Sequence, residues 1–344
     1  MGKIMKYVTI NNRKIGAEFP PYIVAEVSAN HNGKIEQAKA IMLAAKSNGA
    51  DAVKLQTYTP DTLTIDCDKP DFLIKEGLWS GNKLYDLYKQ AYTPFEWHKD
   101  LFDYARKIDI ACFSSPFDKT AVDLLEDLNT PAYKIASFEV IDLPLIKYVA
   151  NTGKPMIIST GMANLAEIEE SLDTALSNGC KEIILLHCIS AYPAPIEESN
   201  LKTIQDMASR FSIVTGLSDH TLGTTASISA VALGASFIEK HFTLSRKDKG
   251  PDSMFSLEPE ELKSLCIHSR EAWSALGCSS YERKESEKSN SMFRRSLYFV
   301  QDATKGSVLD DTTVRSIRPG YGLAPKFYPD VIGRKLNQDV ERGT

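Results

Sequence analysis

The segment IVTGLSDHTLGTTASISAVALGASFIEKH, residues 213–241, determines the fold expected for this chain. It contains a short β-type run ending at His220, a helical stretch, and a second β-type run ending at His241. Such a unit places its strands parallel and side by side, so two imidazoles at their ends could hold one divalent metal with open coordination positions. The alternative is a pair of hydrogen-bonded histidines near the surface of a core. Because His31 and His187 also fall in or just after β-type runs, the cluster favours a site.

The same strand–helix unit recurs throughout the preceding sequence. Six further β-type runs cover residues 22–28, 52–56, 110–115, 133–137, 156–160 and 182–188. Helix-period segments lie near residues 35–48, 94–107, 118–128, 142–151, 164–178, 199–209, 223–233 and 258–276. Eight strand–helix pairs in strict alternation predict a closed (β/α)8 TIM barrel, an α/β fold, over residues 1–278. An open doubly wound sheet is the alternative, although it does not require eight units.

Three segments fall outside this rhythm. Residues 58–93 follow the second strand, and we expect them to form an active-site loop at the strand ends. This loop carries the aromatic residues Trp79, Tyr85 and Tyr88. Residues 279–290 are polar and charged without an apolar period, which is typical of a linker. Residues 291–344 are too short for another barrel repeat and are predicted to form a small second domain.

Composition limits the partners of this chain. A formal net charge of -5 and a pI near 5.8 argue against nucleic acid or an acidic membrane surface as the main partner. No run approaches the roughly 18 apolar residues of a membrane span, and the opening MGKIMK lacks the apolar core of a signal peptide. The six cysteines show no CxxC or metal-type spacing. We therefore expect a cytoplasmic, reduced protein.

Polar side chains gather where the predicted strands end, the edge at which TIM barrels place their chemistry. Lys54 and Lys134 lie inside otherwise apolar strands, where a buried ammonium requires an anion. A phosphate or carboxylate ligand could supply the negative charge; the alternative is a carboxylate of the protein itself, such as Glu26 or Glu139. Strand-end hydroxyls would complete an anion site: Ser115, Ser137, Ser159 and Ser218.

These groups suit one type of reaction. A metal that polarises an aldehyde beside a bound phosphorylated enol, with the carboxylate of Glu26 nearby, is an arrangement for forming a carbon–carbon bond. No GxxxxGK loop is present, so the sequence gives no support for ATP-dependent chemistry.

Seven motifs, in order, resemble the sialic acid synthase family. They are IVAE (23–26) with NHNG (30–33), ADAVKLQ (50–56), SPF (115–117), YKIAS (133–137), STGM (159–162), LSDH (217–220) and EKHF (239–242). Several loops most resemble the bacterial pseudaminic acid synthase branch: TYTPDT (57–62), GLW (77–79), SSPFD (114–118), SAYPAP (190–195) and GPDS (250–253). At Ser190 many N-acetylneuraminate synthases carry asparagine, so this position departs from the sialic acid pattern.

The resemblance implies a transferase that condenses phosphoenolpyruvate with an acetamido sugar to give a nonulosonic acid. In the pseudaminic acid branch the sugar is 2,4-diacetamido-2,4,6-trideoxy-L-altrose. An N-acetylneuraminate or legionaminate synthase with the same chemistry is an alternative, and a non-catalytic sugar-binding protein is an alternative of another class.

The same resemblance implies a role for each matching residue. His220 and His241 would ligate Mn2+, with Mg2+ or Co2+ as other candidates. Phosphoenolpyruvate would be held by Lys54, Ser115, Lys134, Ser137, Ser159 and Ser218. The sugar or the attacking water would be faced by Glu26, Gln56, Tyr192 and Asp252.

The tail from Arg294 to Thr344 is similar to the antifreeze-like (SAF) domain of these synthases. The match of its segment RPGYG (318–322) implies a domain-swapped homodimer in which Arg318 reaches the partner's active site.

Overall fold

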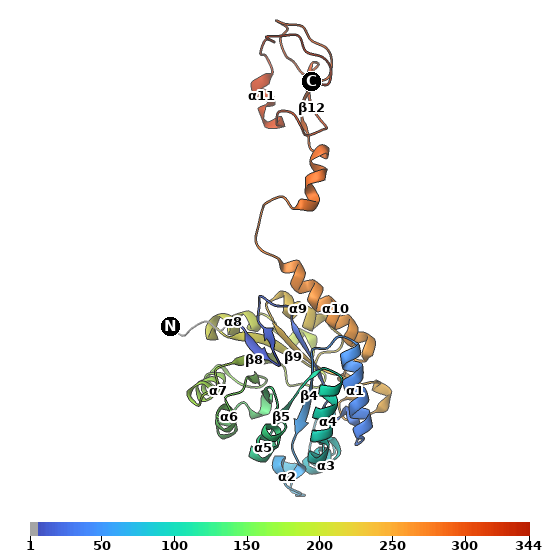
Figure 1. Ribbon diagram of the computed structural model, residues 1–344, viewed down its shortest axis with the longest axis vertical. Helices are drawn as coiled ribbons and strands as arrows, with labels where there is room; N and C mark the ends of the chain where they lie inside the picture. Colours follow the sequence, from blue (N-terminus) through green and yellow to red (C-terminus); the bar gives the residue numbers. More distant parts are fainter. Residues whose placement is uncertain (1–5) are drawn as a thin grey trace. The chain divides into compact units, whose positions relative to one another are not determined.

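A computed structural model describes residues 6–344 of the chain. Residues 1–5, which belong to the opening where no export signal was predicted, lie outside the described part. The chain divides into two compact units, Met1–Gly277 and Cys278–Thr344 (Figure 1). Each unit is described by itself below.

The first unit contains a closed barrel of eight parallel strands, as the alternation of strands and helices predicted. The strands follow one another in chain order, and the last pairs with the first, Glu239 lying opposite Val24 and His241 opposite Glu26. In order they are β3 (Tyr22–Glu26), β4 (Ala52–Thr57), β5 (Ala111–Pro116), β6 (Tyr133–Ile135), β7 (Met156–Ser159), β8 (Ile183–Cys188), β9 (Val214–Asp219) and β10 (Phe237–His241).

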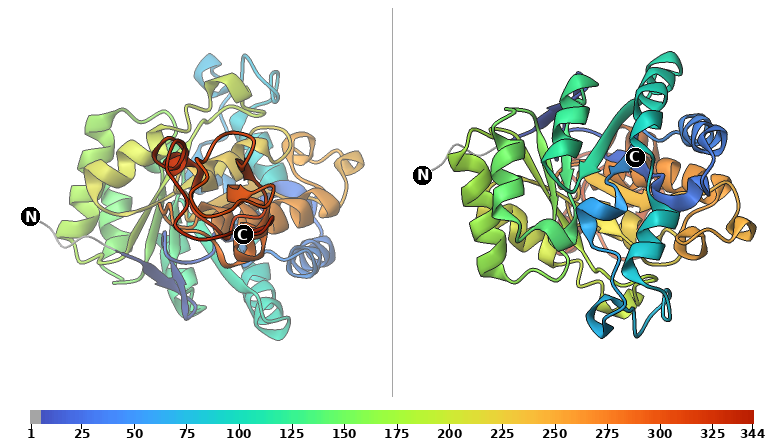
Figure 2. Two further views of the ribbon diagram at one scale, coloured as in Figure 1. Left: turned by 90° about the horizontal axis from the view of Figure 1, so that it is seen from above. Right: turned by 90° about the horizontal axis from the view of Figure 1, so that it is seen from below.

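Helices surround this barrel (Figure 2). Their buried apolar side chains, such as Ile41, Leu101 and Leu265, form one core with the outward-facing strand residues, such as Ile23 and Val53. The helices that follow the strands are α1 (Ile35–Ser47), α4 (Phe95–Lys107), α5 (Lys119–Asp127), α6 (Leu143–Ala150), α7 (Leu165–Ser177), α8 (Thr203–Phe211), α9 (Thr225–Ala232) and α10 (Pro259–Leu276).

The barrel interior is apolar at the start of the strands and polar at their ends. Tyr22, Phe113 and Phe237 cluster near the strand starts with residues of a small antiparallel hairpin, β1 (Val8–Ile10) and β2 (Arg13–Ile15). The hairpin was not anticipated from the sequence. Since side chains alternate along a strand, the interior positions one step further on carry the predicted polar residues.

The insertion after β4 is structured. It contains α2 (Pro60–Leu63), a 3-10 turn at Pro70–Phe72, and α3 (Leu84–Ala91). As expected, it lies at the strand ends: Trp79 and Tyr88 line a cavity there, whereas the Tyr85 hydroxyl contacts Asp61 on the outer side.

The second unit has its own small core. Strands β11 (Ser296–Phe299) and β12 (Val314–Ile317) pair antiparallel, and Leu297, Leu309 and Val314 pack together between them and α11 (Tyr328–Val331). The expected linker belongs to this unit, and residues Glu285–Phe293 form a 3-10 helix.

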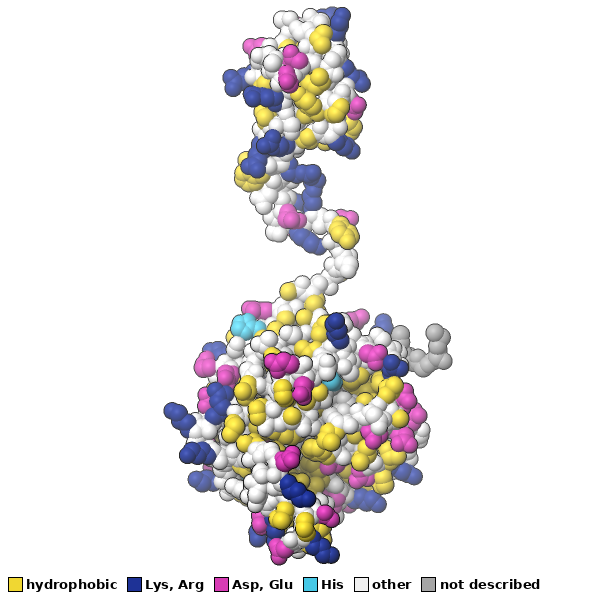
Figure 3. All heavy atoms as spheres, turned by 180° about the vertical axis from the view of Figure 1, so that it is seen from behind, with side chains coloured by type: hydrophobic (Ala, Val, Ile, Leu, Met, Phe, Trp, Pro, Cys, Tyr) yellow, Lys and Arg dark blue, Asp and Glu magenta, His cyan; other side chains and the backbone are white. Residues whose placement is uncertain are grey.

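Within residues 6–344, no helix is both long and apolar enough to cross a bilayer. On the face of the barrel unit shown in Figure 3, acidic and basic side chains are interspersed.

Candidate active site

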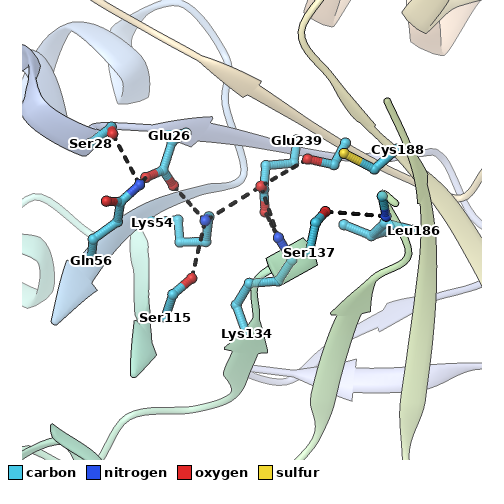
Figure 4. Close-up of polar contacts among 12 residues, drawn as sticks. Glu26, Ser28, Lys54, Gln56, Ser115, Lys134, Ser137, Leu186, Cys188 and Glu239 are labelled. Atoms are coloured by element: carbon cyan, nitrogen blue, oxygen red, sulfur yellow. Dashed lines mark hydrogen bonds and ion pairs between the residues drawn. The ribbon is translucent and has the colours of Figure 1, made fainter. Parts of the chain in front are cut away.

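Four buried charged side chains meet at the polar end of the barrel interior (Figure 4). The Lys54 ammonium lies 2.9 Å from Glu26 Oε2 and 3.4 Å from Glu239 Oε1. Lys134 Nζ lies 3.0 Å and 3.2 Å from the two carboxylate oxygens of Glu239. Protein carboxylates therefore pair with both lysines, as the alternative above expected, with Glu26 for Lys54 but Glu239, not Glu139, for Lys134.

Burial and charge act in opposite directions on these groups. Burial raises the pKa of Glu26 in spite of the neighbouring Lys54. Burial also opposes ionisation of Glu239, but the ammoniums of Lys134 and Lys54 outweigh it and lower the pKa of that carboxyl to about 2. Glu239 is thus an ionised counterion shared by both lysines. The burial of Lys134 lowers the pKa of its ammonium, which makes an additional anion favourable beside it.

The predicted serine hydroxyls surround the lysines. Ser115 Oγ accepts a hydrogen bond from Lys54 (3.2 Å), and Ser218 Oγ donates one to Glu239 (3.2 Å). Ser137 Oγ accepts from the backbone N–H of Gly161 at 3.2 Å. Ser159 Oγ is buried without a hydrogen-bond partner among the described residues, so it is available to a ligand.

Gly161 allows the backbone to lie close to the hydroxyls of Ser137 and Ser190. A Cβ at this position would lie 2.1 Å from Ser190 Oγ and 2.8 Å from Ser137 Oγ. A side chain here would therefore displace both hydroxyls.

The two histidines predicted as ligands face each other. The ring centroids of His220 and His241 are 5.4 Å apart. His220 Nδ1 lies 2.9 Å from the backbone oxygen of Ile189, so in its neutral form the imidazole carries its proton on Nδ1 and leaves the Nε2 lone pair free. His241 Nδ1 is buried and lacks a hydrogen-bond partner among residues 6–344.

This donor set fits a divalent metal with open positions. Burial and the nearby charge of His220 and of the lysines lower the pKa of His241 well below its ordinary value, so its imidazole is neutral. Burial lowers the pKa of His220, but the adjacent Cys188 more than compensates and the net shift is upward. The described residues contain no cluster of three or more His, Cys, Asp or Glu arranged for a metal. Two imidazoles would therefore supply the protein ligands, and water or substrate the rest.

A buried ion pair outside the barrel fixes the turn that carries His220. Lys240 Nζ lies 2.9 Å from Asp219 Oδ2 and donates to the backbone oxygen of Thr221 at 2.6 Å. Asp219 accepts further hydrogen bonds from the Thr221 N–H and the Ser227 hydroxyl. Residues 219–221 are thereby attached to β10, next to His241.

A cavity of about 390 Å3 opens beside these groups. Of the residues predicted to face the sugar, Gln56, Tyr192 and Asp252 line it, and so does His241. The ring of Tyr192 lies 4.5 Å from that of His220.

Glu26 reaches the cavity only through Gln56. It is fully buried and accepts a hydrogen bond from Gln56 Nε2 at 3.1 Å; the same amide donates to Ser28 Oγ at 3.0 Å. The Ser28 hydroxyl in turn donates to Asp252 Oδ2, and this oxygen lies 3.8 Å from His241 Nδ1. Glu26, Gln56, Ser28 and Asp252 thus form a chain of contacts from the lysines to the histidines.

Glu139 is a site residue that the sequence suggested only as a lysine partner. It lines the cavity, and its Oε2 is buried without a hydrogen-bond partner in the described part of the chain. Burial raises the pKa of this carboxyl to about 7. Its position in the 3-10 turn Ser137–Glu139, shortly after the strand that carries Lys134, was the available signal.

Arg318 belongs to the second unit. Its guanidinium carbon lies 6.0 Å from the centre of the Phe293 ring.

The chain is similar to known proteins along nearly its whole length. Residues 41–281 match the NeuB family and residues 294–344 match the SAF domain. The pseudaminic acid synthase of Campylobacter jejuni strain 81-176 is 45% identical over 94% of each chain. An N,N'-diacetyllegionaminic acid synthase of C. jejuni is 39% identical over 91% of this chain and 94% of that protein.

A solved structure shows the same fold. The N-acetylneuraminic acid synthetase of Leptospira borgpetersenii, in complex with citrate, has a TM-score of 0.75 and 30% identity, covering 84% of this chain and 96% of that one. The chain therefore belongs to the NeuB family and ends in an SAF domain.

Proposed function

We propose that this chain is a pseudaminic acid synthase. It condenses phosphoenolpyruvate with 2,4-diacetamido-2,4,6-trideoxy-L-altrose and water, and it releases pseudaminic acid and phosphate. The similarity to pseudaminic acid synthases over nearly the whole chain supports this sugar. The observation that carries the chemistry is that Lys54, Lys134, His220 and His241 lie close together at one end of the barrel.

Lys54 and Lys134 hold the phosphate of phosphoenolpyruvate. Their two positive charges are balanced by Glu26 and Glu239 in the ligand-free chain, so the incoming anion competes for the ammoniums. The raised pKa of Glu26 favours this exchange, because protonation of that carboxyl releases Lys54 for the anion. The free hydroxyl of Ser159 adds a hydrogen bond.

His220 and His241 would hold the metal, Mn2+ in our proposal, with Mg2+ or Co2+ as substitutes. When bound, the ion supplies Lewis-acid stabilisation of the negative charge that develops on the sugar aldehyde oxygen.

The side chains in the cavity guide the bond changes. C3 of phosphoenolpyruvate forms a bond to C1 of the open-chain sugar, water adds at C2, and the C–O bond to phosphate breaks. One carboxylate takes the proton from the water; Glu26 is the candidate from sequence, and Glu139 is better placed because it lines the cavity with a free oxygen. A pKa near 7 suits a group that accepts and returns a proton at neutral pH.

The assembly is part of the proposal. The SAF domain of one chain would reach the active site of a second chain in a domain-swapped homodimer, with Arg318 contributed in trans to the sugar site. We place the enzyme in the bacterial cytoplasm, where phosphoenolpyruvate is available.

A substrate panel tests the proposal. The protein is incubated with phosphoenolpyruvate and, separately, the trideoxy diacetamido sugar, the legionaminic acid precursor and N-acetylmannosamine, each with Mn2+ or with a chelator. We expect metal-dependent phosphate release with the first sugar and its loss in His241→Ala. Release with another sugar alone would reassign the substrate, and unchanged turnover in the chelator would contradict the metal. No release with any sugar would favour a non-catalytic sugar-binding protein.

A further inference from the structure

Helix α3 in the insertion has an apolar face that the rest of its unit covers only in part. Leu84, Leu87, Tyr88 and Ala91 are spaced i, i+3, i+4 and i+7, which places them on one side of the helix. None of the four is buried, and all four line the cavity. In α4, by contrast, the apolar face is buried in the barrel core.

Further apolar side chains that line the same cavity extend the apolar face of α3. Tyr58, itself 2% exposed, contacts the rings of Tyr88 (centroids 5.9 Å apart) and Phe117 (5.3 Å), and Leu63 of α2 also lines the cavity. We call this set the apolar wall: Tyr58, Leu63, Leu84, Leu87, Tyr88, Ala91 and Phe117.

The same cavity is also lined by polar groups of the candidate active site. These are Ser28, Gln56, Glu139, His241 and Asp252. The indole N–H of Trp79 donates to the backbone oxygen of Pro251 at 3.1 Å, which ties the insertion to the loop that carries Asp252. A ligand that reaches the histidines therefore presents another side to the apolar wall.

We propose that the apolar wall, of which Leu87 is part, selects the sugar by receiving its methyl groups. This inference rests on the proposed function, whose sugar carries a C6 methyl and two acetyl methyls. A hydroxyl placed against the aliphatic side chains of this wall, Leu63, Leu84, Leu87 and Ala91, would lose its water without gaining a partner. The wall therefore discriminates against sugars with free hydroxyls at C4 and C6, such as N-acetylmannosamine.

Two substitutions of one side chain test the wall. Leu87→Asn keeps the size of the side chain but makes it polar, and Leu87→Ala shortens it. Leu73→Ala is the matched control, because Leu73 belongs to the same insertion, is 42% exposed and does not line the cavity. The measurements are kcat and KM for the trideoxy sugar, and kcat/KM or a competitive inhibition constant for N-acetylmannosamine.

We expect Leu87→Asn to lower kcat/KM for the trideoxy sugar about 10- to 100-fold, mainly by raising KM. For N-acetylmannosamine, kcat/KM or the inhibition constant should stay unchanged or show tighter binding. Leu87→Ala should lower kcat/KM for the trideoxy sugar about 10-fold, and Leu73→Ala should leave it unchanged. An unchanged preference between the two sugars in folded Leu87 variants would overturn the inference while leaving the proposed function intact.

If Leu87→Asn does not fold, Ala91→Ser adds a hydroxyl to the same wall with little change in volume and carries the same prediction. If the wild-type protein does not use the trideoxy sugar, the proposed function itself fails, and the wall's selection of methyl groups fails with it.

Discussion

Replacement of Glu139 by glutamine should change how the stability of the protein and its rate of phosphate release depend on pH. The folded protein raises the pKa of this carboxyl from 4.5 to about 7. Between these values the folded chain binds more protons than the unfolded chain, so the group makes the protein less stable as pH rises through this range. Glutamine cannot ionise and removes this effect.

The size of the stability change follows from the pKa shift of Glu139. At 1.36 kcal/mol per pKa unit the full effect is about 3 kcal/mol, and partial solvent access reduces it to about 1–3 kcal/mol. For a unit of this length that corresponds to about 2–10 °C in melting temperature. Glu139→Gln should therefore gain stability relative to the wild type by this amount between pH 5 and pH 8.

Two assays examine this expectation. Calorimetric melting at pH 5 and pH 8 measures the stability difference, and phosphate release between pH 5.5 and 9 measures the rate. We expect the wild-type kcat/KM to change with an apparent pKa near 7 and the variant to lose that step together with at least about 100-fold in rate. A melting difference that does not vary with pH would refute the raised pKa, and a full-rate variant would refute the proton-transfer role.

Two further substitutions probe the buried charges. Lys240→Met leaves Asp219 buried without its cation and should cost about 3–5 kcal/mol in urea unfolding, part of which Asp219→Asn should restore in the double variant; a loss below about 1 kcal/mol would contradict the ion pair. Glu239→Gln removes the carboxylate partner of Lys134 and should lower the pKa of that ammonium further below its ordinary value. The unfolded chain then binds the extra proton, so the stability of the variant relative to wild type should rise from pH 7 to pH 10 in melting experiments, and a flat difference would argue against this coupling.

The barrel could be predicted because the same periodicity repeats eight times and its boundaries carry turn residues. Asn48 and Asn178 end helices, and each is followed by a glycine with positive φ. The helix expected near residues 199–209 begins later, because Asn200 adopts a positive φ and α8 begins only at Thr203. The short hairpin at residues 8–15 has too few residues to show a period.

The sequence predicts a site residue only where the residue's own position at the end of a strand identifies it. The lysines, serines and histidines were identified from their positions at strand ends. The partner of Lys134 could not be, because Glu239 lies 105 residues away and meets it only across the closed barrel interior. Likewise, the apolar wall depends on how α3 folds back over the strand ends, which the insertion's irregular sequence does not reveal.

A direct count of bound Mn2+ tests the central claim, that His220 and His241 together hold one ion. Equilibrium dialysis, with the free ion followed by electron paramagnetic resonance, compares the wild type with His220→Ala, His241→Ala and the exposed control His268→Ala. We predict one tightly bound ion per chain in the wild type and the control, and at least about 10-fold weaker binding in each of the other two variants. Wild-type affinity in either His220→Ala or His241→Ala would contradict the account.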